Sequence, residues 1–184
     1  VPYSSKLSPR GAEYRYFPAW RRTREFGGGD VCDWGAHHID IAQWGLGVDE
    51  RGPVEVIAPD DWENANQGAQ LVYPGGIPVI HDNQGSGVSF YGKEGEVHVG
   101  RGKFKFILNG KVIHKFWERD EDSDTSCERE VELTRREYLA NAKVCLYRST
   151  NHQSDWLDSI KTRKNPICSV AIGASTVISC HLLN

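Results

Sequence analysis

Seven short β-prone runs, separated by turn-forming residues, limit what this chain can fold into more than any other feature of its sequence. The runs are 54–57, 69–73, 77–81, 87–91, 96–99, 104–108 and 112–116. Asn109 and Gly110 separate the last two runs, and Asn-Gly is a strong signal for a two-residue hairpin because both residues tolerate a positive φ. Hairpins pair their strands antiparallel, so the sequence predicts a large, open, predominantly antiparallel sheet.

Helices are predicted on both sides of these runs. Residues 30–46 contain no proline and space apolar residues for one helix face, with Asp30 as the N-cap and Gly45 or Gly47 at the end. The other predicted helices are 135–147, 153–163 and 170–183, and the acidic segment 118–130 is predicted to be a solvated loop. These helices are too few to cover both faces of a broad sheet. The sequence therefore predicts an α+β fold with helices on one face, whose other, open face is used for self-association.

Length and charge narrow the class of protein. The chain has 184 residues, about one domain, and it carries 22 Lys and Arg against 25 Asp and Glu, a net charge of −3. This balance argues against binding to nucleic acid, and no run approaches the ~20 apolar residues of a membrane span. The five cysteines form no C-x-x-C pair and are predicted to be small buried apolar residues.

The densest group of polar side chains lies in the predicted helix 30–46 and comprises Asp33, His37, His38 and Asp40. Positions i and i+4 share a helix face, so Asp33 and His37 lie side by side. A carboxylate beside an imidazole fixes its tautomer and favours its protonated form, which suits a general acid or base near neutral pH. The alternative is an ordinary helix in which Asp33 interacts with the helix dipole and the histidines are satisfied in the core.

A metal site is an alternative reading of the same histidines. His37, His38, Asp40 and the pair His81-Asp82 are residue types that bind metals. Adjacent histidines on a helix point about 100° apart, so His37 and His38 do not readily bind one ion. We therefore assign no metal ligands.

Arginine and aromatic residues alternate just before the helix. The segment contains Trp20, Arg21, Arg22, Arg24 and Phe26. Such residues can clamp an anionic or sugar-like ligand, and the alternative is solvated arginines beside packed aromatic rings.

Cofactor motifs are absent from the sequence. It contains no P-loop and no G-x-S-x-G, and the glycines at 27–29 follow an arginine-rich segment rather than a β-prone run. No cofactor-binding residues are assigned. The chain contains no Met, so we expect it to be part of a longer protein.

Residues 27–44 read GGGDVCDWGAHHIDIAQW, and this segment resembles the GGG-x-x-x-D-x-G-x-H-x-x-D segment of the Gfo/Idh/MocA oxidoreductases. Residues 88–97 and 156–166 resemble two further segments of the same family in the same order. The resemblance is closest to bacterial members. It implies a soluble protein of the bacterial cytoplasm or periplasm.

The resemblance implies that residues 1–184 are a single C-terminal domain for substrate binding and oligomerisation. Asp33 and His37 match the family's catalytic pair, with His37 as the proton acceptor. The implied substrate-binding residues are Trp20, Arg21, Arg24, His38 and Asp40. NAD or NADP would bind a dinucleotide-binding domain outside this chain. The family's catalytic lysine has no counterpart here, so the chain alone is expected to be inactive.

The expected function is therefore the substrate-binding and catalytic half of a nicotinamide-dependent oxidoreductase acting on a sugar, polyol or related hydroxyl compound. The expected partners are that small molecule and further copies of the chain, through the open sheet face. Two alternatives remain open. One is an oligomerisation or carbohydrate-binding module without redox activity, and the other is an NAD-dependent glycosidase.

Overall fold

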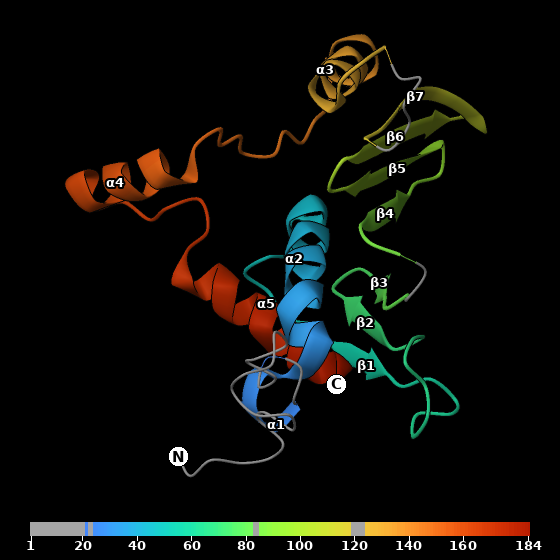
Figure 1. Ribbon diagram of the computed structural model, residues 1–184, viewed down its shortest axis with the longest axis vertical. Coiled ribbons are helices and arrows are strands. Elements are labelled where there is room, and N and C mark those ends of the chain that lie inside the picture. The colour runs from blue at the N-terminus through green and yellow to red at the C-terminus, as the bar shows by residue number, and fades with distance from the viewer. Residues whose placement is uncertain (1–20, 22–23, 83–84, 119–123) are drawn as a thin grey trace, which may run out of the picture. The chain divides into compact units, whose positions relative to one another are not determined.

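All seven predicted runs form strands in the structure, a computed structural model (Figure 1) that describes residues 21, 24–82, 85–118 and 124–184. The strands pair antiparallel throughout, and the α+β class is confirmed. The chain divides into two compact units, which we call unit 1 (Val1–Asp82 with Tyr147–Asn184) and unit 2 (Asn83–Leu146).

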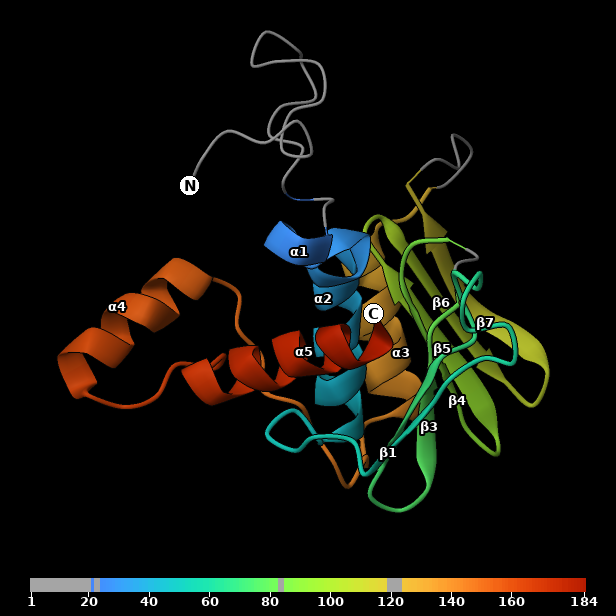
Figure 2. The same cartoon turned by 90° about the horizontal axis from the view of Figure 1, so that it is seen from below.

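Unit 1 combines a small sheet with helices. Its helices are α1 (Arg24–Gly27), α2 (Gly29–Leu46), α4 (His152–Thr162) and α5 (Val170–Leu183). Its strands are β1 (Glu55–Ile57), β2 (Gln70–Tyr73) and β3 (Ile77–Ile80), in the order β1-β2-β3. Helix α5 packs against α2 and also contacts β2 (Figures 1 and 2).

Helix α2 begins earlier than predicted. The expected N-cap Asp30 is wrong, because the helix begins at Gly29 and Asp30 lies in its first turn. Gly28 is the N-cap in a left-handed conformation with φ 74°, and a Cβ there would collide with Cys32. The predicted end is confirmed at Gly47, whose φ of 67° lets its N–H bond the carbonyl groups of the last turn.

The side chain of Gln43 is completely buried at the junction of α2, α5 and β2. Its Nε2 lies 2.9 Å from the hydroxyl of Tyr73 and 3.2 Å from that of Ser179, and its Oε1 lies 3.1 Å from the hydroxyl of Thr176. Burial raises the pKa of the Tyr73 phenol, which keeps it protonated. The amide of Gln43 on α2 therefore connects this helix to α5 and β2. It lies next to the apolar cluster of Val48, Leu71 and Tyr73.

The described residues of unit 2 form a four-stranded sheet and one helix. Its strands are β4 (Val88–Tyr91), β5 (Gly95–Gly100), β6 (Lys103–Leu108) and β7 (Lys111–Trp117), in the order β4-β5-β6-β7. Helix α3 (Cys127–Tyr138) packs against β6 and β7 (Figure 2).

The hairpin expected at Asn109 and Gly110 in unit 2 is confirmed. Asn109 and Gly110 have φ values of 50° and 75° and join β6 to β7 as a two-residue turn. Phe104 and Phe106 are buried while Lys103 and Lys105, which alternate with them, are more exposed, so one face of the sheet carries the core.

Three expectations need correction. The described strands form sheets of three and four strands, so one large sheet is an overstatement. The segment 127–130 is helical rather than loop, because the Ser126 side chain accepts a bond from the N–H of Arg129 and acidic residues occupy the first turn. The helix predicted at 135–147 ends at Tyr138, and residues 139–146 are not helical.

Among the described residues, no helix has the length and apolar character needed to cross a membrane.

We expect Gln43→Ala to lower the free energy of unfolding of the chain by about 2–4 kcal/mol, because buried hydroxyl groups lose their partner and a cavity forms. Urea denaturation followed by circular dichroism measures this change. The matched control is Gln153→Ala, at an exposed position of α4, which should change the unfolding midpoint little. Equal midpoints for the two variants would contradict the structural role of Gln43.

Candidate functional site

The candidate site lies along the edge of α2 that carries Asp33 and His37. Helix periodicity brings Asp33 and His37 to this edge, four residues apart. The buried residues of α2 are Ile39, Ala42 and Gln43, on other parts of its circumference. The edge with Asp33 and His37 is therefore not used by the core of unit 1.

Arg21 holds the carboxylate of Asp33. Its Nη2 donates to both carboxylate oxygens, at 2.7 and 2.8 Å. The hydrogen bond to Asp33, and then the charge of Asp33, raise the pKa of Arg21. The fold thus brings together Arg21 of the arginine-rich segment and Asp33 of the helix.

His37 is exposed, and its ring lies 5.8 Å from that of Trp34 at an angle of 56°. Within the described part of the chain, His37 makes no hydrogen bond to Asp33, whose carboxylate is engaged by Arg21. His38 is the next residue along the helix and is partly buried. His37 is therefore the more accessible imidazole.

The remaining predicted site residues have different surroundings. Asp40 Oδ1 lies 3.1 Å from the hydroxyl of Thr176, so Asp40 helps Gln43 to hold α5 on α2. Arg24 is exposed in α1. Trp20 and Arg22 lie outside the described residues.

No group of three or more His, Cys, Asp or Glu side chains in the described ranges is arranged to hold a metal ion. The backbone of His81, one of the residues of metal-binding type, pairs with Gly68 and Ala69.

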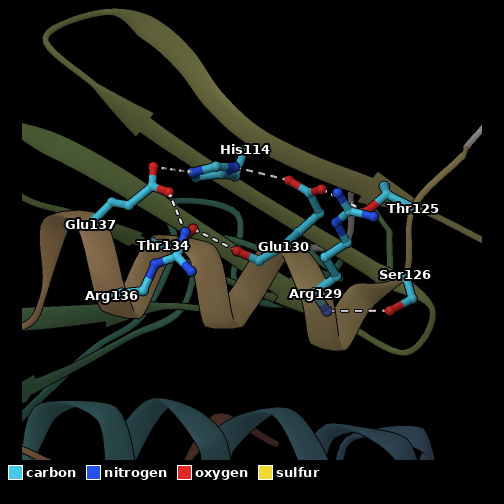
Figure 3. Close-up of polar contacts among 8 residues, drawn as sticks. All are labelled: His114, Thr125, Ser126, Arg129, Glu130, Thr134, Arg136 and Glu137. Carbon is cyan, nitrogen blue, oxygen red and sulfur yellow. Dashed lines mark hydrogen bonds and ion pairs between the residues drawn. The ribbon is translucent and has the colours of Figure 1, made fainter.

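Sequence reasoning missed a buried polar cluster in unit 2, shown in Figure 3. The side chains of His114 on β7 and Glu130 on α3 are 14% and 12% exposed, and His114 Nδ1 lies 3.0 Å from Glu130 Oε2. His114 Nε2 lies 3.8 Å from Glu137 Oε2 and has no hydrogen-bond partner among the described residues. Because a carboxylate only accepts, Nδ1 carries the proton facing Glu130.

This cluster joins α3 to the sheet of unit 2. The hydroxyl of Thr125 donates to Glu130 Oε1 at 2.7 Å, so both oxygens of Glu130 are bound (Figure 3). The alternation of β7, which places His114 opposite Phe106, could have indicated its buried position. Because residue 130 was expected to lie in a loop, Glu130 was not recognised as the partner of His114.

The cysteines differ from the expectation that all five are buried. Cys180 is buried, Cys32 and Cys127 are partly buried, and Cys145 and Cys168 are exposed; all five are free thiols. Burial raises the pKa of Cys180 to about 12.

Cys32 lies close to the end of α5. Its Sγ is 3.8 Å from His181 Nδ1 and 3.5 Å from Asn184 Nδ2. Burial raises the pKa of this thiol as well, partly offset by hydrogen bonds to Asn184 and Cys180. Both thiols therefore stay protonated near neutral pH in the packed helix pair.

Comparisons of this chain with family models, with curated proteins and with solved structures found no match.

We expect Cys180 to be alkylated by iodoacetamide at pH 8 at least ~100-fold more slowly than Cys145. The thiolate is the reacting form, and a thiol with a pKa of about 12 is ionised in only about one molecule in 10⁴ at this pH. Peptide mass spectrometry over time measures both rates. In denaturant the two should converge, and equal rates in the native chain would contradict the packing of α5 on α2.

Proposed function

We propose that residues 1–184 are the substrate-binding and catalytic half of a nicotinamide-dependent oxidoreductase acting on a sugar, polyol or related hydroxyl compound. The observation that carries the proposal is the division of polar residues along α2. Asp40 and Gln43 are bound to α5, whereas Asp33 and His37 lie outside those contacts. A pair that the fold does not use for packing is available for chemistry.

In this proposal His37 accepts the proton of the substrate hydroxyl. Its exposed imidazole can be approached by a small molecule, and the ring of Trp34 beside it offers an apolar face to the carbon skeleton of a sugar. Asp33 lies one turn away, with its carboxylate held by Arg21.

Arg21 has two roles in the proposal. It fixes the carboxylate of Asp33 through Nη2, and its Nε and Nη1 hydrogens can donate to substrate hydroxyl groups. Arg24, exposed in α1, supplies a further polar group before the start of α2. Asp40 contributes through the carboxylate oxygen that Thr176 does not bind.

A nicotinamide cofactor held by another domain would supply the hydride acceptor for this oxidation. The described residues do not form a binding site for the pyrophosphate of NAD or NADP, since the glycines before α2 follow α1 rather than a strand. The proposal therefore places NAD or NADP on a dinucleotide-binding domain outside residues 1–184.

The proposal includes self-association through an open sheet face. In unit 1, Ile57 and Ile80 both pair with Gln70, on the face opposite the buried Leu71 and Tyr73, and they are 39% and 56% exposed. Apolar side chains gathered on an uncovered sheet face favour contact with a second copy.

In the longer protein that carries the dinucleotide-binding domain, we expect His37→Ala to lower kcat by about 10²- to 10⁴-fold, the usual contribution of a general base. Steady-state kinetics of sugar or polyol oxidation, followed by nicotinamide absorbance, measures the loss. Thermal melts of the same variants separate a loss of rate from a loss of folding.

His38→Ala is the matched control, because its ring points about 100° away from that of His37 on the same helix. It should cost far less rate than His37→Ala. Normal turnover in the His37→Ala enzyme would remove His37 from the reaction, and losses of stability in both variants without a selective loss of rate would favour a purely structural role.

A further inference from the structure

Three chemically complementary side chains meet on the sheet of unit 2. Ser89 on β4 lies directly opposite His98 on β5, and Glu96 precedes His98 by two residues on the same strand. All three therefore point to one face of the sheet. Lys105, which pairs with His98 from β6, alternates with the buried Phe104 and Phe106, so this face is the one opposite α3.

A chain of hydrogen bonds connects the three residues. Ser89 Oγ lies 2.7 Å from His98 Nδ1, and His98 Nε2 lies 2.9 Å from Glu96 Oε2. A carboxylate only accepts, so Nε2 carries the hydrogen that faces Glu96. In the neutral imidazole Nδ1 is then the acceptor, and the Ser89 hydroxyl donates to it.

The imidazole is also held by packing. The ring of Tyr91 meets that of His98 edge-on, with centroids 5.7 Å apart and an angle of 87°. The side chain of His98 is only 23% exposed, whereas Ser89 is exposed. A base oriented by a third group and bonded to an accessible hydroxyl is the general arrangement of an activated nucleophile.

We propose that Ser89 is a nucleophilic serine that accepts the acyl group of small activated esters. Ser89 Oγ attacks the ester carbonyl carbon while its proton passes to His98 Nδ1. The bond from that carbon to the alcohol oxygen breaks, the departing alcohol takes the proton from His98, and the acyl group remains on Ser89. Water then attacks the acyl-serine with His98 again accepting a proton, which restores the hydroxyl and releases the acid.

The surroundings of Ser89 favour a small acyl group. The hydroxyl is on an exposed sheet face, so a short acyl chain reaches it without any movement of the strands. Lys105, on the strand beside His98, places a positive charge on the same face, which favours the negative charge that develops on the carbonyl oxygen.

This site is separate from the proposed oxidoreductase chemistry. Ser89, His98 and Glu96 belong to unit 2, whereas Asp33 and His37 belong to unit 1. The acyl transfer uses no nicotinamide, so either proposal can fail while the other holds.

The test uses the 1–184 chain with p-nitrophenyl acetate and, separately, with a fluorophosphonate that labels activated serines. We expect acetyl and phosphonyl groups on Ser89, located by peptide mass spectrometry. Ser89→Ala should abolish both labels, and His98→Gln should slow labelling about 10²-fold. Glu96→Gln should slow it less, since an amide oxygen can still accept from Nε2.

Ser86→Ala is the matched control, at a neighbouring exposed serine, and it should label like the parent chain. Circular dichroism of each variant establishes that the sheet is intact. The proposal is overturned if Ser89 takes up no phosphonate, if acetyl groups appear only on lysines, or if a folded His98→Gln chain labels Ser89 at the parent rate.

Discussion

The amide of Gln43 is the interaction on which the arrangement of unit 1 depends. It lies where α2, α5 and β2 meet and is bound to hydroxyl groups from two of these elements. A buried amide without partners costs free energy, so this network is stable only when all three elements are in place. It therefore determines which edge of α2 faces α5 and which edge stays outside that contact.

The orientation of α2 has a chemical consequence. Gln43 and Asp40 bind residues of α5, whereas the carboxylate of Asp33 is bound by Arg21 and the side chain of His37 is exposed. In unit 2 the alternation of strands has a similar effect. Phe104 and Phe106 lie in the core beneath α3, and the opposite face carries Ser89, His98 and Glu96.

Local patterns were sufficient to predict the strands, the turn at Asn109-Gly110 and most helices. Asp30 was the expected N-cap of α2 because its side chain can cap a helix. The helix instead begins at Gly29, after Gly28 with its positive φ. The acidic composition of residues 118–130 favoured a solvated loop, so the start of α3 was not predicted, although Ser126 is a favourable N-cap. The pairings of Arg21 with Asp33, His114 with Glu130 and Ser89 with His98 depend on tertiary packing or strand register, which one sequence does not specify.

The most direct measurement of the central claim is the response of the histidine ring resonances in the NMR spectrum of the 1–184 chain to added polyols. If the edge of α2 binds hydroxyl compounds, the His37 ring and the Trp34 indole should shift together and saturably, while His114 in unit 2 should not respond. Unchanged His37 resonances at saturating concentrations of a broad series of sugars and polyols would contradict the assignment of this edge as a substrate site.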